Sequence, residues 1–127
     1  MDTSKLIEIH KQISELRKKA NNTDSKKETY QIEKEIKDLQ YDFEKVMDNL
    51  LDELPGEIEL RARVNKLIYY DTWDFKSWIA GELLERDNIE DLDIMKELKT
   101  SIEEEFDPSY EIDDEDVTIE FVDDKYK

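Results

Sequence analysis

The chain has 127 residues, 36 of them acidic and 19 basic, so its formal net charge is −17 at pH 7. This charge argues against direct binding to nucleic acid or anionic lipid and favours basic protein surfaces as partners. The absence of cysteine excludes disulfides and thiolate metal sites.

No targeting or membrane segment is expected. Residues 1–20 alternate charged and apolar side chains, unlike a signal peptide. No run approaches the roughly 20 apolar residues of a membrane span. We therefore expect a cytoplasmic protein without a membrane partner.

The first 54 residues predict two helices that form an antiparallel hairpin. One helix lies between Asp2–Ser4 and the polar cluster 21–25, and the other between about Lys27 and Pro55-Gly56. The polar connection between them is short, which favours a hairpin. Apolar residues recur in both at steps of three and four, as in a heptad pattern: Leu6, Ile9, Ile13, Leu16 and Ala20, then Ile32, Ile36, Leu39, Phe43, Val46 or Met47, Leu50 and Leu54.

Charge divides the chain into two parts. Residues 1–51 carry a net charge of −1, whereas residues 52–127 carry −16. Within one domain, 1–127, we therefore expect a near-neutral hairpin (1–54) for packing or self-association. The acidic remainder (57–127) would face a partner.

The middle of the chain predicts two more helices. Residues 57–70 place Leu60, Val64, Leu67 and Ile68 on one helical face, and Asp71-Thr72 offers an N-cap for a helix that continues through Leu83. Aromatic residues cluster here: Tyr69, Tyr70, Trp73, Phe75 and Trp78. We expect this cluster to be the hydrophobic centre; the alternative is that some rings form an exposed anchor for a partner.

The next segment predicts an acidic helix. Asp87-Asn88 would cap it and Asp107-Pro108 would end it. Its apolar residues share one face: Ile89, Leu92, Met95, Leu98, Ile102 and Phe106. Four carboxylates project from nearly the opposite side and form a stripe: Glu90, Asp93, Glu97 and Glu104.

The C-terminus alternates apolar and polar residues on either side of an acidic turn, which predicts a short β-hairpin. Tyr110 and Ile112 precede the turn, and Val117, Ile119 and Phe121 follow it. Alternatively, the last strand adds to a partner's sheet. The acids of the turn are Asp113, Asp114, Glu115 and Asp116. The expected fold class is mainly α, with the N-terminal hairpin packed against a C-terminal helical segment.

No residue pattern points to catalysis, a metal or a cofactor. His10, the only histidine, lacks a recognisable nucleophile motif, and we expect it to be a partly exposed helix residue. Two glycines are too few for a phosphate-binding loop. EF-hand registers starting at Asp107 or Asp113 place Ile112 or Val117 where glycine or a ligand is needed. We therefore expect a protein that is not an enzyme.

The carboxylate stripe favours a phosphate-mimic hypothesis. Carboxylates three or four residues apart on a helix lie about 5–6 Å from each other at Cβ, and a charge of −17 exceeds the magnitude of about 2–8 that solubility needs. Acids at 52–59 would extend the row. The candidate partner-binding residues are Glu90, Asp93, Glu97, Glu104, Asp113, Asp114, Glu115 and Asp116.

In its small size, lack of cysteine, acidity and helical character, the chain resembles the DNA-mimic inhibitors that bacteriophages use against restriction enzymes and CRISPR nucleases. The resemblance lies in composition and charge layout over the C-terminal 76 residues, without a shared motif. It implies an inhibitor, acting in the host cytoplasm, that occupies the basic groove of a nucleic-acid-binding protein such as a nuclease. Immunity proteins that neutralise nuclease toxins look similar. Another alternative is an assembly protein that forms a homodimer through residues 5–54.

Overall fold

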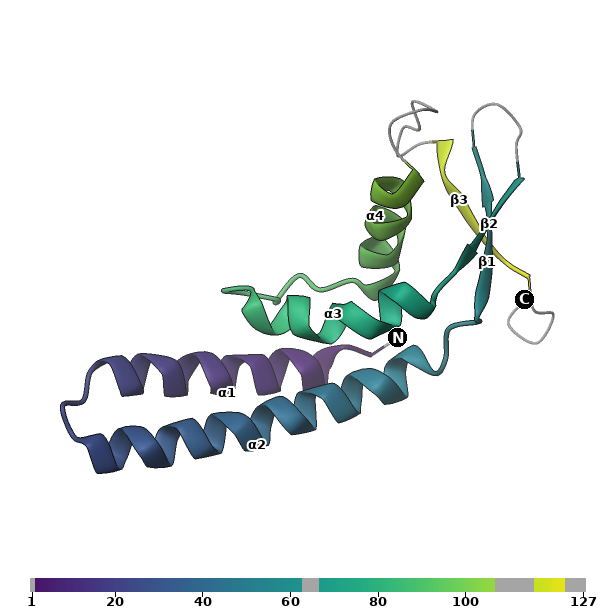
Figure 1. Ribbon diagram of the computed structural model, residues 1–127. Coiled ribbons are helices and arrows are strands. Elements are labelled where there is room, and N and C mark those ends of the chain that lie inside the picture. Colours follow the sequence, from purple (N-terminus) through teal and green to yellow (C-terminus); the bar gives the residue numbers. More distant parts are fainter. Residues whose placement is uncertain (1, 63–66, 107–115, 123–127) are drawn as a thin grey trace. The chain divides into compact units, whose positions relative to one another are not determined.

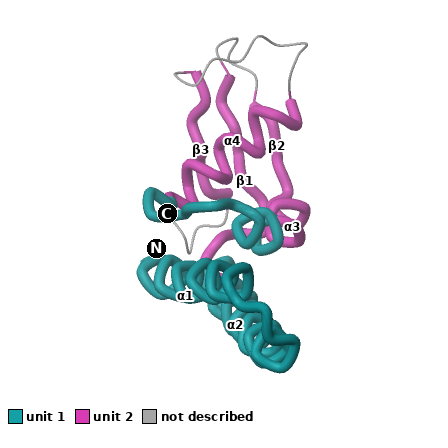
Figure 2. Tube along the Cα trace, turned by 90° about the vertical axis from the view of Figure 1, so that its left-hand side faces the viewer, with its two compact units in different colours: residues 1–51, 79–92 teal, residues 52–78, 93–127 magenta. Residues whose placement is uncertain are grey.

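The computed structural model describes residues 2–62, 67–106 and 116–122 (Figure 1). These residues form four helices and one three-stranded antiparallel sheet, which confirms the mainly α fold class. The chain divides into two compact units (Figure 2). Unit 1 comprises Met1–Leu51 and Ile79–Leu92, and unit 2 comprises Asp52–Trp78 and Asp93–Lys127. The expectation of a single domain stays a prediction.

The predicted N-terminal hairpin is confirmed by α1 (Ser4–Asn21) and α2 (Lys26–Leu51), which pack side by side (Figure 1). The connection is organised by side chains that bond the backbone. Ser25 Oγ accepts a hydrogen bond from the Glu28 N–H at 3.3 Å, and the Glu28 carboxylate accepts one from the Thr23 hydroxyl at 3.0 Å. The N-terminus of α2 is thereby capped where the sequence changes from polar to heptad-like.

Apolar residues of the hairpin and of segment 79–92 form the core of unit 1. Leu6, Ile13, Phe43 and Met47 are almost completely buried. His10 is buried as well, with 4% of its surface exposed, and its Nε2 lies 2.7 Å from the Arg86 carbonyl oxygen. The expectation of a partly exposed His10 is therefore wrong. Its hydrogen bond makes burial tolerable because a buried polar group is costly only without a partner.

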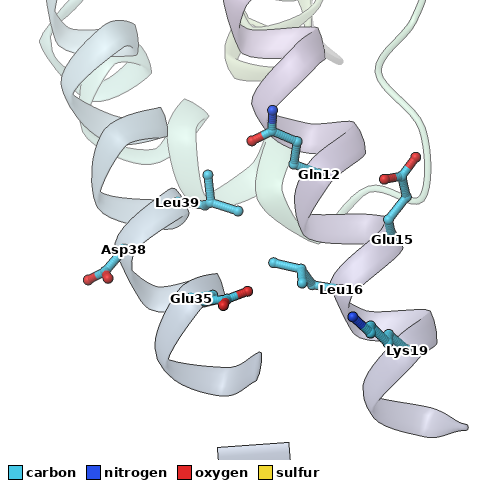
Figure 3. Close-up of a pocket in the computed structure, with 7 residues that line it drawn as sticks. All are labelled: Gln12, Glu15, Leu16, Lys19, Glu35, Asp38 and Leu39. Atoms are coloured by element: carbon cyan, nitrogen blue, oxygen red, sulfur yellow. The ribbon is translucent and has the colours of Figure 1, made fainter. Parts of the chain in front are cut away.

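A surface groove lies between α1 and α2 on the half of the hairpin nearer the interhelical connection (Figure 3). Its volume is about 530 Å³, and Leu16 and Leu39 supply its apolar part. Polar side chains surround them: Gln12, Glu15, Lys19, Glu35 and Asp38. Both leucines are only half-buried. The predicted homodimer through residues 5–54 stays a prediction.

Residues 57–62 and 67–70 are not helical, and the prediction of a helix through them is wrong. They contribute β1 (Glu57–Arg61) and most of β2 (Leu67–Asp71), which pair as antiparallel strands. The stretch Glu57–Ala62 alternates charged and apolar residues, and Ile58, Leu60 and Ala62 are buried. A period of two places these residues on one face of a strand, and this pairing prevails over the weaker helical pattern.

The sheet is completed by β3 (Thr118–Phe121), which pairs with β1, so the strand order is β2-β1-β3. The predicted strand at 117–121 is confirmed in its last four residues. Its expected neighbour around Tyr110 and Ile112 lies outside the described residues. In the described part of the chain, β3 pairs instead with a strand that begins at Glu57.

One face of the sheet packs against α4 (Ile94–Phe106) within unit 2 (Figures 1 and 2). Tyr70 makes this contact: its hydroxyl lies 3.4 Å from Ser101 Oγ, and its ring meets Phe106 edge to face at a centroid distance of 6.0 Å. Burial raises the pKa of the Tyr70 phenol above its usual value, against the opposing effect of the Ser101 hydrogen bond. Tyr70 is therefore a core residue.

The predicted helix after Asp71-Thr72 is confirmed as α3 (Trp73–Glu85), and the boundary between the two units falls within it (Figure 2). Asp71 Oδ1 accepts a hydrogen bond from the Trp73 N–H at 2.9 Å, and the Thr72 carbonyl accepts one from the Lys76 N–H at 3.0 Å. None of the helices among the described residues has the length and hydropathy needed to cross a membrane.

Candidate partner-binding site

The predicted carboxylate stripe does not lie on one helix. The helix begins at Ile94 rather than near Asp87, so its predicted start is wrong. Glu97 and Glu104 are seven residues apart on α4 and share one side of it. Glu90 lies in the preceding connection, in unit 1, and forms an ion pair with Lys11 at 3.4 Å. Asp93 is the residue immediately before α4.

Side chains that bond the backbone explain the late start of α4. Asn88 Oδ1 accepts a hydrogen bond from the Glu90 N–H at 2.6 Å, which forms a turn instead of a helix. Asp93 Oδ1 accepts hydrogen bonds from the N–H groups of Met95 and Lys96 at 3.0 and 3.3 Å. Asn and Asp favour such local bonds over helix interiors. Asp93 is therefore the N-cap of α4 rather than part of its exposed face.

Of the four acids in the predicted turn, one belongs to the described residues. Asp113, Asp114 and Glu115 lie outside the described residues, whereas Asp116 is half-buried. Of the eight predicted site residues, the structure thus places Glu97 and Glu104 together on α4, with Asp93 at its start. All three belong to unit 2.

A second acidic surface lies on the face of the sheet that points away from α4. The sequence predicted the acids at 52–59 as an extension of the carboxylate row, but not as part of a sheet face. We call this second surface the open face. Its residues are Glu57, Glu59 and Arg61 of β1, Leu67, Tyr69 and Asp71 of β2, and Thr118 and Glu120 of β3. The strand register places Tyr69 beside Glu59, and Glu59 beside Glu120, in one row. Four carboxylates thus share a face with a single arginine.

Arg61 is partly neutralised on this face. Its guanidinium pairs with the Glu120 carboxylate at 3.2 Å across β1 and β3. Because both side chains remain in contact with solvent, this ion pair contributes at most about 1 kcal/mol to stability. The open face therefore keeps a negative balance, which Glu57, Glu59 and Asp71 carry.

Large apolar side chains of β2 and α3 are exposed. The exposed fractions are 53% for Leu67, 63% for Tyr69 and 73% for Trp73, which is the first residue of α3. Trp78 is 39% exposed, with its ring edge to face against Phe75. The expected hydrophobic centre is confirmed for Tyr70 and Phe75, which are core residues. Tyr69, Trp73 and Trp78 lie at the surface instead, and the alternative that such rings anchor a partner stays a prediction.

Exposed aromatic rings beside carboxylates suit a cationic partner. Tyrosine and tryptophan rings attract Lys and Arg through cation–π interactions, and they are enriched among the residues that dominate binding energies at interfaces. Carboxylates pair with the same cations. The open face therefore combines two recognition elements for basic side chains.

The signal for this face was present in the sequence. Glu57, Glu59 and Arg61 alternate with Ile58, Leu60 and Ala62, which is the pattern of a half-buried strand. The run Leu67–Tyr70 is rich in the β-branched and aromatic residues that strands favour. Reading residues 57–70 with a period of two would have placed Tyr69 and Tyr70 on opposite faces.

Other site chemistry receives no support from the described ranges. Among residues 2–62, 67–106 and 116–122, no group of three or more His, Asp and Glu side chains is placed to hold a metal ion. The groove of Figure 3 carries both lysine and carboxylate side chains.

The two units differ in charge. Unit 2 has 20 acidic and 8 basic residues, a net charge of −12, while unit 1 has a net charge of −5. The open face and α4 both belong to the more acidic unit. Comparison of the chain with protein-family models, with curated proteins and with solved structures gave no match.

Proposed function

We propose that this protein binds a basic nucleic-acid-binding protein, such as a nuclease, and inhibits it by occupying the groove that normally holds DNA or RNA. The observation that carries the proposal is the open face of unit 2. There, Glu57, Glu59 and Asp71 lie beside exposed Tyr69 and Leu67, in a unit with a net charge of −12.

The mechanism is competitive. Carboxylates of unit 2 pair with the Lys and Arg side chains that hold phosphates, and long-range attraction accelerates the encounter. Glu97 and Glu104 on α4, and the acids at 113–116, are further candidates for these pairs. Glu90, which belongs to unit 1, stays a predicted partner-binding residue.

Capture at low ionic strength tests the proposal directly. The immobilised protein should retain a basic nucleic-acid-binding protein, and double-stranded DNA or RNA should displace that protein. The activity of the captured protein should fall when a stoichiometric amount of the acidic protein is added. Affinity should drop steeply between about 0.05 and 0.2 M salt because exposed charges are screened. Equal affinity at both salt concentrations, or binding that nucleic acid does not compete with, contradicts the mechanism.

A charge-reversal variant locates the surface. Replacement of Glu57 and Glu59 by lysine should weaken binding roughly thirtyfold, at about 1 kcal/mol for each reversal. The matched control replaces Glu33 and Glu44 of α2 by lysine, since these residues are exposed and belong to unit 1. Both variants change the net charge equally. If they lose affinity equally, binding depends on overall charge and not on this surface.

A further inference from the structure

The edge of the sheet formed by β2 has the features of a strand-accepting site. In the described part of the chain β2 pairs with β1 on one side, and the sheet ends there. A terminal strand presents backbone N–H and C=O groups that can pair with an added strand. The exposed side chains of Leu67 and Tyr69 lie on this strand.

The register identifies which backbone groups point outward. The Thr72 N–H donates to the Gly56 carbonyl at 3.0 Å, in register with the pairs of β1 and β2. Bonded pairs alternate along an antiparallel ladder, so Tyr70 and Ile68 bond β1. The N–H and C=O groups of Leu67, Tyr69 and Asp71 therefore face away from β1. The same residues carry the outer side chains of the open face.

Charge selects the occupant. Side chains of an added antiparallel strand that lie opposite Leu67, Tyr69 and Asp71 would project over the open face, near Glu59 and Glu57. Basic residues at these alternate positions would pair with Asp71 or stack on the Tyr69 ring. A second copy of β2 would instead bring two units of net charge −12 together, which repulsion disfavours.

We propose that β2 accepts an extended segment of the partner as an added antiparallel strand, and that this segment carries Lys or Arg at every second position. The inference deepens the proposed function, on which it rests for the basic character of the partner. It adds a binding mode, β-strand addition, in which the backbone bonds supply affinity and the open face selects the sequence.

A peptide pair tests the mode with the unaltered protein. The probe is a short peptide in which lysine alternates with threonine. In the proposed pairing, the lysine N–H groups bond β2 and the threonine N–H groups point away. N-methylation of the lysine residues should therefore weaken binding at least about tenfold, at roughly 1 kcal/mol for each lost bond. The same number of N-methyl groups on threonine should leave affinity unchanged.

Two further measurements report on β2 itself. Hydrogen exchange at the amides of Leu67 and Tyr69 should slow when the peptide binds, whereas exchange at Tyr70 should be unaffected. Tyr69→Pro removes the outward N–H and leaves the bonds to β1, so it should weaken peptide binding about tenfold. Tyr69→Val, which keeps the N–H but loses the ring, should weaken it less.

The outcomes separate this inference from the proposed function. Equal affinity of the two methylated peptides, or unchanged exchange at Leu67 and Tyr69, overturns strand addition even if the Glu57/Glu59 variant loses inhibition. The reverse result, strand addition without inhibition of any nucleic-acid-binding protein, overturns only the proposed function. Concentration-dependent dimerisation that Tyr69→Pro abolishes would overturn the assignment of a basic segment as the occupant.

Discussion

Thr72, the residue after β2, is linked through its side chain to the residues that precede β1. It is fully buried, and its hydroxyl donates a hydrogen bond to the Pro55 carbonyl at 2.7 Å. Its backbone N–H donates to the Gly56 carbonyl, while its own carbonyl starts α3. Thr72 thus connects the start of β1 and the end of β2 to the first turn of α3. The sequence analysis identified Thr72 as an N-cap candidate, but not this contact.

Replacement of Thr72 by valine should destabilise unit 2. Valine has nearly the same shape but leaves the buried Pro55 carbonyl without its hydroxyl donor, which costs about 1–3 kcal/mol. Urea denaturation measures the change in the free energy of unfolding. Thr72→Ser is the control, because it keeps the donor and loses only a methyl group. A valine variant as stable as the serine variant would show that the hydrogen bond contributes little.

At the scale of single elements, Asp93 has two separable roles. Its side chain caps α4 through the Met95 and Lys96 N–H groups, and its charge made it one of the predicted partner-binding residues. Asn caps a helix about as well as Asp, so the roles can be tested independently.

Asp93→Ala should therefore lower the free energy of unfolding by about 0.5–2 kcal/mol, because the cap is lost. Asp93→Asn should keep most of that stability but weaken binding to a basic partner, because only the charge is lost. Thermal unfolding and affinity measurements on both variants provide the comparison. If Asp93→Asn binds as tightly as the unaltered protein, Asp93 acts as a cap only.

Apolar residues of the α1–α2 hairpin differ in how completely they are buried. Phe43 is completely buried, whereas Leu39, one turn away, lines the groove of Figure 3 and is half-buried. On folding, a half-buried side chain loses less of its contact with water than a fully buried one does. Its contribution to stability should be smaller in proportion.

Phe43→Ala should accordingly lower the free energy of unfolding by about 3–5 kcal/mol. Leu39→Ala should cost about 1 kcal/mol, since less apolar area leaves water there on folding. Denaturant unfolding of the two variants measures the difference, and circular dichroism confirms that each remains helical. Equal losses would show that Leu39 is covered in solution, as the homodimer prediction for residues 5–54 requires.

At the scale of the whole molecule, we expect self-repulsion to be the dominant electrostatic effect. A net charge of −17 on 127 residues opposes the folded state. Salt screens this repulsion, and at about 1 M the screening length falls to about 3 Å.

The melting temperature should therefore rise by several degrees between low salt and about 0.5 M sodium chloride, since a gain of 1 kcal/mol shifts the Tm by about 4–8 °C in a small domain. Scanning calorimetry measures the shift. A neutral sugar at matched osmolality controls for solvent exclusion. A constant or falling Tm would show that attractive ion pairs outweigh the repulsion.

Local periodicity predicted those elements whose pattern had one interpretation. The heptad spacing from Leu6 to Leu54 and the cap at Asp71-Thr72 led to α1, α2 and α3. Prediction failed where two periods competed. Residues 57–70 allow a helical face through Leu60 and Leu67, but they also allow the alternation of Ile58 and Leu60 that β1 adopts.

The candidate site was predicted less well than the fold. The apolar spacing of Ile89, Leu92 and Met95 suggested a helix, yet bonds from Asn88 and Asp93 to the backbone delay it until Ile94. Glu90 therefore lies outside α4 and is not part of a carboxylate stripe on that helix. The open face was missed because it joins β1, β2 and β3, and β3 lies about sixty residues after β1 in the chain.

The sequence by itself determined the excess of negative charge, its concentration after residue 51 and the N-terminal hairpin, because composition and helical periodicity are local properties. Only the tertiary structure decided that Tyr69 is exposed while Tyr70 is buried, and that Glu59 lies between Tyr69 and Glu120. These outcomes depend on which distant strand pairs with β1 and on which face α4 covers. No stretch of neighbouring residues carries that information.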